Sequence, residues 1–514
     1  MTGQRAITLY LNGGNNNWRI DEGTEMNNDS PPPRKKNVRV QYLLFAIAGL
    51  LLLFVGKFPF PQSVLEAGDV VLQPQGRMAL GILFFCLFLW VTEPVPFHIT
   101  GCIGVLLMTF LKLDSFGNII RLGFGNDTVV FLIGVLVLSS VMTRSGLGKR
   151  VSMFILSLTG NKATTIILGF IIAGVFVGMF ISNMAVAAML MPLAKAMLEE
   201  ERLKPKESNF GKALMISCSY GATISGITTP AAAAPNIIAM NYIKGLGVDI
   251  TFLEWMVYGV PTAFLLVIPC WLILIKVFKP EISHLSKTTE ELATEFKKLG
   301  PMNRNEIATT IIFFITITLW ISSTWLNDLT GIDLAGSVPA LVCTCLFFMP
   351  GITTLKWKQV SEDISWEAII LIATGMSMGL IMHQAGAALW LANVLVGGIT
   401  GIHPLVQIFM IVMIIELIKV GLSSNTVTAA IIMPIMVALA QSQNLPLKGI
   451  LIPAALSLSL AFILVASSPT NLIPYSAGYF SIADMAKAGA IITVFSAIII
   501  ALSIFSIGSF MGIY

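Results

Sequence analysis

The amino-acid sequence predicts an all-α polytopic membrane protein, with about 11 transmembrane helices plus two re-entrant hairpins arranged as an inverted repeat. Three observations lead to this fold class: apolar runs recur along the chain, charged residues are scarce, and a set of landmarks occurs twice. Of the 514 residues, 56% are hydrophobic and 11% are charged, whereas a soluble domain carries about 25% charged residues. The net charge of +4 is small, so it bears on membrane topology and does not indicate nucleic-acid binding.

The first 40 residues differ from the rest of the chain. They are polar, rich in Asn, Gly and Pro, and include the basic run Pro33-Arg34-Lys35-Lys36. No apolar core precedes a small-residue cleavage site, so residues 1–40 are expected to be a disordered cytoplasmic tail and not a signal peptide. Residues 41–113 are expected to form N-terminal scaffold helices. Apolar runs typical of transmembrane helices continue to the end of the sequence, among them 42–55, 79–91, 128–142, 257–277 and 490–505.

Two polar tripeptides interrupt apolar segments on the same template. Ser182-Asn183-Met184 and Ser424-Asn425-Thr426 lie 242 positions apart, and a Met-Pro pair follows each at the same distance. Small polar residues are costly in lipid because the bilayer core offers no hydrogen-bond partners. Each tripeptide is therefore expected at the turn of a hairpin that enters the membrane and returns, over residues 164–198 and 402–442.

The duplication extends to both sides of these tips. Upstream, an apolar run begins at Asp127 and another at Glu367, and each closes at a glycine 19 residues later. Downstream, an apolar segment is broken by Pro and Asn near 228–236 and again near 466–471, and an acid-x4-Gly step follows each break. Four landmarks in the same order indicate an internal repeat.

The landmarks also set the domain boundaries. The first repeat is expected over 114–278 and the second over 307–514, with a charged cytoplasmic connector over 279–306. Basic residues follow the run from Asp127 but precede the run from Glu367, so the two copies are predicted to be inverted, with the N-terminus in the cytoplasm and the C-terminus outside. The protein is expected in the cell membrane.

The tips and breaks carry the predicted chemistry. Helix ends leave backbone N–H and C=O groups without partners, and a proline removes a further donor. Free N–H groups at helix N-termini suit the oxygens of an anion, while carbonyl and Asn oxygens suit a small cation such as Na⁺. Inverted repeats with interrupted helices at the midplane indicate a secondary transporter.

The same residues resemble a family. The paired tips, the breaks and the segment Trp90-Val-Thr-Glu93-Pro94-Val-Pro96 are similar to the divalent anion:sodium symporter family, which includes sodium/dicarboxylate, citrate and sulfate carriers. The resemblance implies an elevator-type homodimer that binds its substrate between two Na⁺ sites. It implies substrate contacts at Ser182, Asn183, Ser424, Asn425, Thr426, Pro235, Asn236, Ser468, Pro469 and Thr470, and Na⁺ contacts at Ser182, Asn183, Thr228, Thr229, Ser424, Asn425, Ala466 and Ser467.

The chain departs from the family pattern around both tips. Met184 replaces a threonine in the first tip, and Gly178 and Val420 stand one turn before the tips, where Na⁺-coupled members tend to carry a hydroxyl. Lys419 and Glu416 lie in the same apolar arm. They are candidate charge-compensating residues, because a fixed ammonium could take the place of a Na⁺ ion.

The predicted function is secondary active transport of C4 dicarboxylates such as succinate, malate and fumarate, with Na⁺ as the coupling ion and no cofactor. The alternatives are a Na⁺-independent dicarboxylate, citrate or tartrate exchanger, a sulfate carrier, and a channel. An enzyme is not expected, since no His-Glu-x-x-His metalloprotease motif and no P-loop motif occurs. Membrane lipid, the small dianion and a second copy of the chain are the expected partners.

Overall fold

The computed structural model describes most of the chain: residues 9–10, 19–20, 38–67, 70–245, 247–248, 250–286, 294, 296–331, 336–396, 402–422, 424–442 and 445–513. The predicted tail, residues 1–40, lies almost wholly outside them. Its described parts are the antiparallel strands β1 (Leu9–Tyr10) and β2 (Arg19–Ile20) and the first residues of α1.

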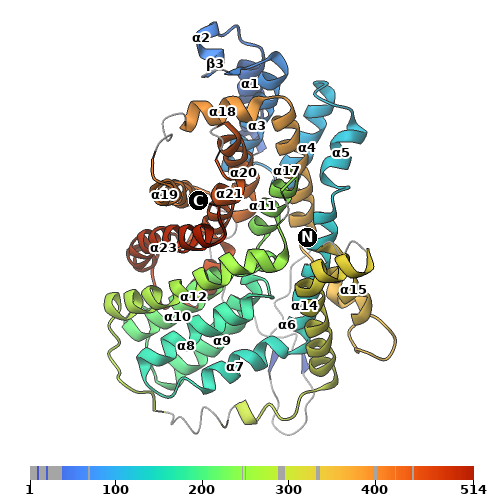
Figure 1. Cartoon of the computed structure of the whole chain (residues 1–514). Helices are drawn as coiled ribbons and strands as arrows, with labels where there is room; N and C mark the ends of the chain where they lie inside the picture. The colour runs from blue at the N-terminus through green and yellow to red at the C-terminus, as the bar shows by residue number, and fades with distance from the viewer. Residues whose placement is uncertain are drawn as a thin grey trace.

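The remainder is helical apart from a second short antiparallel pair, which confirms the all-α class (Figure 1). Up to the connector the elements are α1 (Val38–Lys57), α2 (Gln62–Leu65), β3 (Glu66–Ala67), β4 (Val70–Val71), α3 (Pro74–Thr92), α4 (Phe97–Phe110), α5 (Phe116–Gly123), α6 (Asp127–Ser145), α7 (Leu147–Ser157), α8 (Ala163–Gly178), α9 (Asn183–Glu200), α10 (Asn209–Ser225), η1 (Pro230–Ala232), α11 (Ala234–Gly245) and α12 (Phe252–Val277).

The second half is built from the same kinds of element. It contains α14 (Arg304–Thr330), α15 (Ser337–Phe347), α16 (Trp357–Glu362), α17 (Trp366–Gln384), α18 (Ala387–Val396), α19 (Pro404–Val420), α20 (Asn425–Ser442), α21 (Leu447–Ser459), η2 (Val465–Ser467), α22 (Pro469–Ser476) and α23 (Ile482–Phe510).

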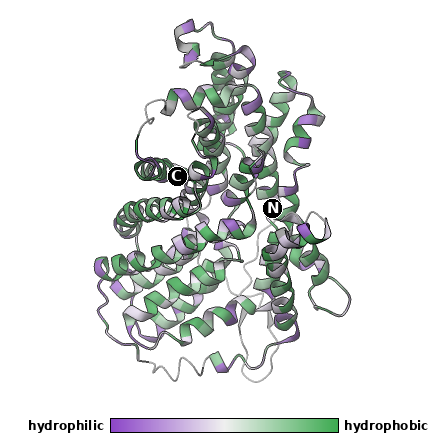
Figure 2. Cartoon of the chain, viewed as in Figure 1, coloured by the Kyte–Doolittle hydropathy of each residue, from purple (hydrophilic) through white to green (hydrophobic). Residues whose placement is uncertain are grey.

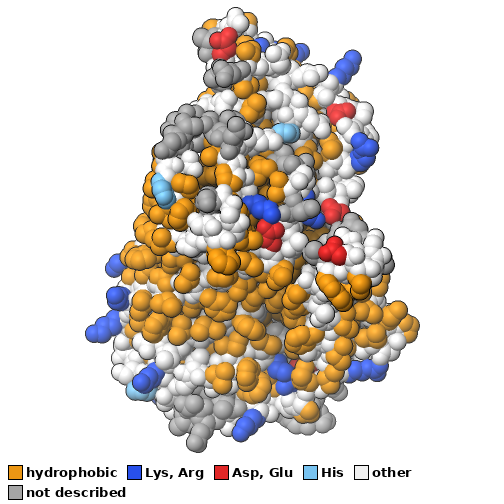
Figure 3. Space-filling model, in the orientation of Figure 1, with side chains coloured by type: hydrophobic (Ala, Val, Ile, Leu, Met, Phe, Trp, Pro, Cys, Tyr) orange, Lys and Arg blue, Asp and Glu red, His pale blue; other side chains and the backbone are white. Residues whose placement is uncertain are grey.

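Seven of the described helices are long and apolar enough to cross a membrane, and the five apolar runs quoted above lie within α1, α3, α6, α12 and α23. Hydrophobic residues line the helices throughout (Figure 2). On the molecular surface they form a broad band across the face shown, with Lys and Arg side chains along its lower edge and at its upper end (Figure 3). The chain is therefore an integral membrane protein. Five shorter apolar helices are present as well, and the total of about 11 spans remains a prediction.

The two broken helices pack across each other. In the first half α10 ends before η1 and α11 follows it, and in the second half α21 ends before η2 and α22 follows it. Helix α10 contacts α22 of the other half, and α11 contacts α21 and α20. Figure 1 shows α11, α20 and α21 side by side at the centre of the molecule. The two copies of the broken helix thus pack together at the centre of the molecule, and each half supplies helices that contact the other half.

The acid-x4-Gly landmarks lie at the start of the long helix behind each break. Thr251 and Ser481 cap α12 and α23, and the acids three residues later, Glu254 and Asp484, lie in the first turn. The glycines, Gly259 and Gly489, have a separate cause. A β-carbon at either position would overlap the backbone of the break in the same half, at the carbonyls of Ile227 and Phe462. Glycine is required there because the backbones approach too closely for any side chain.

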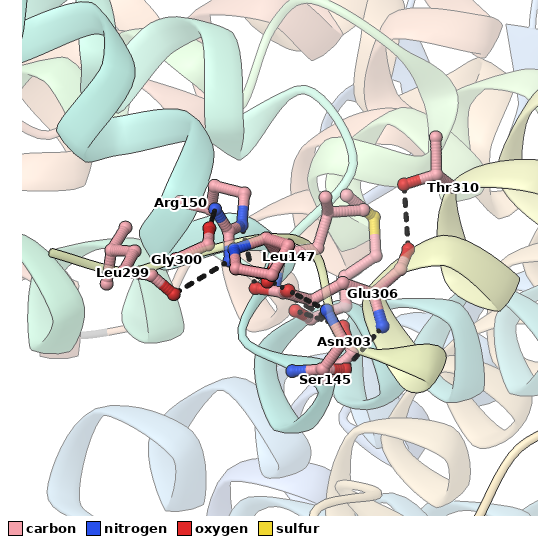
Figure 4. Close-up of polar contacts among 10 residues, drawn as sticks. Ser145, Leu147, Arg150, Leu299, Gly300, Asn303, Glu306 and Thr310 are labelled. Atoms are coloured by element: carbon pink, nitrogen blue, oxygen red, sulfur yellow. Dashed lines mark hydrogen bonds and ion pairs between the residues drawn. The ribbon is translucent and has the colours of Figure 1, made fainter. Parts of the chain in front are cut away.

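The connector is tied to α7 at its C-terminal end. Arg150 of α7 binds both oxygens of Glu306, at 3.0 Å each, and donates to the carbonyl of Gly300 at 2.8 Å. Glu306 also accepts the backbone N–H of Asn303, which completes the N-terminal capping box of α14. Figure 4 shows Arg150 and Glu306 facing each other between the two helices. A largely buried ion pair thus joins the first half to the first helix of the second half.

The segment Trp90 to Pro96 forms the turn between α3 and α4. Glu93 closes α3 in the left-handed region, with φ of 47°. The indole of Trp90 donates to the carbonyl of Phe97 at 3.1 Å, so the aromatic ring holds the two helices together across the turn.

Candidate functional site

The first tip is the short turn between α8 and α9. Ser182 caps α9, because its hydroxyl accepts the N–H of Ala185 at 3.3 Å, as serine does at many helix starts. Its own N–H donates to the hydroxyl of Ser139 on α6 at 2.8 Å. Asn183 is the first residue of α9 and is half-buried, whereas the Met184 side chain is 48% exposed. The N-terminus of α9 therefore lies in the protein interior, and the Ser182 hydroxyl caps one of the N–H groups of its first turn.

The second tip has the same local structure between α19 and α20. The Ser424 hydroxyl accepts the N–H of Val427 at 3.3 Å. Asn425 donates from Nδ2 to the carbonyl of Ser459 at 3.4 Å, and Thr426 is half-buried in the same turn. The Oδ1 atom of Asn425 is buried and has no hydrogen-bond partner among the described residues. Such an atom is expected to meet a ligand, because a buried polar group without a partner is costly.

An asparagine closes each break in the same way. Asn236 donates from Nδ2 to the carbonyls 10 and 7 residues earlier, those of Gly226 and Thr229, at 2.7 and 2.8 Å. Asn471 does the same to Ala461 and Leu464, at 2.8 and 3.1 Å. Each amide thus satisfies carbonyls that the interruption frees. Both side chains are fully buried.

The Oδ1 atoms of these two asparagines face the opposite half of the chain. Asn236 accepts the hydroxyl of Ser459 on α21, at 3.4 Å, and Asn471 accepts that of Ser219 on α10. The polar atoms of both side chains are therefore hydrogen-bonded to protein partners. The two asparagines thus hold each break in its shape.

The remaining predicted residues lie around the breaks. Thr229 donates its hydroxyl to the carbonyl of Met179 at 2.6 Å and so joins the first break to the first tip, while Thr228 donates to Ser225 within its own break. Ser468 caps α22 by accepting the N–H of Thr470. The other four lie in the same segments: Pro235 and Ser467 are buried, and Ala466 and Pro469 are exposed.

Both tips and the first break meet around Gly226. The Nδ2 atom of Asn183 and the Cβ atom of Ser459 lie 2.8 and 3.3 Å from the point that a β-carbon on Gly226 would occupy. Ser459 in turn contacts Asn425 through its carbonyl and Asn236 through its hydroxyl. We call this group the central polar cluster; it consists of Asn183, Ser225, Gly226, Asn236, Asn425 and Ser459. Among the described residues, the Asn425 side chain of the second tip thus contacts Ser459 of α21.

A buried lysine lies at the end of α19, before the second tip. The Lys419 side chain is almost fully buried, and its ammonium donates to the carbonyl of Leu460, where α21 ends, at 2.8 Å. Glu416, one turn earlier, accepts the hydroxyl of Ser496 at both oxygens, at 2.9 Å each. A small cavity of about 10 Å³ lies between these two side chains and the second break, including Ser467. The Lys419 amino group therefore lies on a carbonyl freed by the second break.

Sequence reasoning missed the serines of the central contacts, Ser225 and Ser459, together with Ser139 and Ser219. Their only signal is that they are small polar residues within apolar helices that end near a break or face a tip. Such residues often bond their own backbone, so the sequence could not separate them from ordinary helix serines.

Tips and interrupted helices that meet at a polar centre among apolar helices are typical of secondary transporters. The family described as the sodium:sulfate symporter transmembrane region matches residues 41–514, and the chain belongs to this family.

Individual relatives cover nearly the whole chain. The sodium-dependent dicarboxylate transporter SdcS of Staphylococcus saprophyticus is 28% identical over 494 residues, which is 91% of this chain and 95% of the relative. The transporter of the same name from Staphylococcus aureus strain USA300 is 28% identical over 478 residues, or 90% of this chain and 91% of the relative. The crystal structure of the Alcanivorax borkumensis YdaH transporter is similar in fold, with a TM-score of 0.55 and 13% identity; the match covers 84% of this chain and 98% of that one.

Proposed function

We propose that this protein is a secondary active transporter of small divalent organic anions, namely C4 dicarboxylates such as succinate, malate and fumarate, coupled to Na⁺ by symport. The observation that carries the proposal is the central polar cluster, in which two helix N-termini and their asparagines converge. The names of the two relatives above, both sodium-dependent dicarboxylate transporters, support the substrate class and the coupling ion.

The anion is proposed to bind between the tips. The N-termini of α9 and α20 carry partial positive charge and N–H groups suited to carboxylate oxygens. Two such ends at one cluster match the two carboxylates of a C4 dianion. The proposed contacts come from the tips, Ser182, Asn183, Ser424, Asn425 and Thr426, and from the breaks, Pro235, Asn236, Ser468, Pro469 and Thr470.

Na⁺ is proposed to bind beside each tip, because uncharged oxygens are concentrated there. At the first tip these are the oxygens of Ser182 and Asn183 with the backbone around Thr228 and Thr229, which the Thr229–Met179 hydrogen bond holds against the tip. At the second tip they are those of Ser424 and Asn425 with the backbone around Ala466 and Ser467. The unpartnered Oδ1 of Asn425 is suited to a cation because it can only accept.

The membrane arrangement follows the sequence proposal. We infer that residues 164–198 and 402–442 are re-entrant hairpins, that the repeats 114–278 and 307–514 are inverted with the connector 279–306 in the cytoplasm, and that the N-terminus is cytoplasmic. A homodimer that moves its substrate by an elevator motion of the tips and broken helices is consistent with this division.

The test is transport by the purified protein in liposomes. Uptake of labelled succinate is expected to saturate, to require an inward Na⁺ gradient, and to be inhibited by malate and fumarate more than by sulfate. Saturable uptake of sulfate without uptake of succinate would show that the substrate is sulfate and not a dicarboxylate. Single-channel currents with linear flux would show that the protein is a channel and not a carrier.

A second candidate function has a specific observation in its favour. The ammonium of Lys419 already lies on the Leu460 carbonyl at the second break, where a coupling cation would otherwise bind. This favours a Na⁺-independent exchanger of dicarboxylates, citrate or tartrate. The exchanger would take up succinate without Na⁺, but only into liposomes preloaded with dicarboxylate.

A further inference from the structure

The glycine before the first tip faces a serine on the neighbouring helix. Gly178 is the last residue of α8, and Ser225 is the last residue of α10. A β-carbon at position 178 would overlap both the Oγ and the Cβ of Ser225. The Ser225 side chain therefore fills the volume that any side chain at position 178 would need.

The two helices approach closely one turn earlier as well. A β-carbon at Gly174 would lie 2.8 Å from the backbone of Gly221. Small residues at both crossing points allow the helix backbones to come together, and this packing fixes where Ser225 meets the tip.

The serine hydroxyl lies between two acceptors, one on its own helix and one on the tip, and its single proton is shared between them. Ser225 is fully buried, and its Oγ lies 3.1 Å from Oδ1 of Asn183 and 2.7 Å from the carbonyl of Ala222. With Oδ1 of Asn183 directed at Ser225, the Nδ2 group lies beside Gly226. Because Nδ2 is a donor only, this orientation presents hydrogen-bond donors to the centre.

The second tip lacks a glycine and serine pair of this kind. By the spacing of the tips, Gly178 corresponds to Val420, 242 positions later; by the spacing of Asn236 and Asn471, Ser225 corresponds to Leu460, 235 positions later. Neither position carries a hydroxyl. The amide oxygen of Asn425 accordingly has no partner among the described residues, whereas that of Asn183 is bound.

We propose that Ser225 is the positioning residue of the first tip: it orients the Asn183 amide so that its donors face the anion, and Gly178 is needed to admit it. This inference rests on the proposed function, since it assigns the role to the same site. It predicts that Ser225 acts on substrate affinity through Asn183 and not on folding.

The experiment measures succinate uptake by purified variants in liposomes. Ser225→Ala is expected to raise the KM for succinate roughly fivefold to tenfold, the effect of one lost hydrogen bond, with a much smaller change in maximal rate. Ser217→Ala is the matched control, because Ser217 is also buried on α10 but bonds only the carbonyl of Leu214 in its own helix. It is expected to transport like the unchanged protein.

A hydroxyl exchange tests the packing part of the proposal. Gly178→Ser alone is expected to lose uptake, because its β-carbon overlaps Ser225. The double variant Gly178→Ser/Ser225→Gly moves the hydroxyl to the opposite helix and is expected to recover uptake. Equal KM values for Ser225→Ala and Ser217→Ala, or a double variant no better than Gly178→Ser, would overturn the inference.

A labelling assay provides a readout that does not depend on transport. Met184→Cys places a thiol on the exposed part of the tip, in a background where the exposed Cys345 is replaced by serine. If Ser225 positions the tip, Ser225→Ala is expected to change the rate of thiol modification, whereas Ser217→Ala is not; equal rates would count against the inference. Absence of succinate transport by the unchanged protein would refute the proposed function instead, and the labelling rates would still decide the role of Ser225.

Discussion

The ammonium of Lys448, in the first turn of α21, lies 2.7 Å from the carboxylate of Glu254, in the first turn of α12. The repeat produces the same contact with the halves exchanged, since Lys212 of α10 lies 3.2 Å from Asp484 of α23. Each pair joins the helix before one break to the helix behind the other break. Two crossed ion pairs thus fix the two broken helices relative to each other at the start of each long helix.

Charge reversal at one pair should therefore destabilise the protein, and a swap should restore it. Lys448→Glu places two carboxylates together at a site where both side chains are largely buried, and is expected to cost about 1–3 kcal/mol. The double variant Lys448→Glu/Glu254→Lys is expected to regain most of the melting temperature in detergent. Lys195→Glu, at an exposed pair on α9, is the control and should have little effect; a swap as unstable as the single variant would contradict the pairing.

The asparagines of the two tips should be essential for transport. Asn183→Ala and Asn425→Ala each remove an amide from the central polar cluster while leaving the helix caps Ser182 and Ser424 in place. Both variants are expected to abolish succinate uptake and to retain the elution profile of the folded protein. Asn118→Ala serves as the control, because Asn118 is a half-buried residue of α5 outside the cluster and its side chain bonds only to Asp114 and Arg121 among the described residues. Normal uptake by both tip variants would refute the site.

Lys419 offers a test of the charge at the second break. Lys419→Met removes an ammonium from the Leu460 carbonyl and leaves the buried Glu416 without the nearby positive charge, so uptake is expected to fall at least tenfold at low salt. If the ammonium takes the place of a cation, NaCl is expected to restore part of the uptake and choline chloride is not. Full uptake by the variant in both salts would show that Lys419 has no part in transport.

The loop between α16 and α17 should confer a pH-dependent stability. Burial raises the pKa of Asp363, but hydrogen bonds from Arg144 and Ser140 outweigh it and hold that pKa below its usual range. A carboxyl with a lowered pKa stabilises the folded state above its unfolded pKa of about 3.9, and this contribution is lost as the pH falls through the folded value.

The measurement compares the unchanged protein with Asp363→Asn in thermal unfolding. The unchanged protein is expected to be more stable at pH 7, and the difference should shrink below about pH 4. A difference that is constant from pH 7 to pH 3 would show that Asp363 does not titrate in this range. Glu362→Gln, at the neighbouring position, is the control for a general change in surface charge.

Much of the fold could be predicted because lipid restricts the sequence so strongly. Asp127 begins α6, and Glu367 is the second residue of α17. The predicted tips and breaks lie where α8 meets α9, α19 meets α20, and η1 and η2 interrupt the helices. A polar residue or a proline in an apolar run has few explanations in a membrane, so its position is informative. The hydrogen bonds by which Asn236 and Asn471 close the breaks could not be predicted, because an amide that bonds freed carbonyls and one that binds a ligand have the same spacing.

The sequence by itself determined the membrane class, the internal repeat and the two Ser-Asn tips, because these follow from composition, periodicity and motif order along the chain. The resemblance of its tips, breaks and Trp90 to Pro96 segment to known symporters indicated the family. Only the tertiary structure decided which residues meet. The helix packing brought Ser225 against Gly178 and Asn183, placed Ser459 between Asn236 and Asn425, and laid Lys419 on the Leu460 carbonyl. The physical reason is that these contacts join residues from different helices, and in the case of Asn236 and Ser459 from opposite halves of the chain, so they depend on how the helices cross and not on any local pattern.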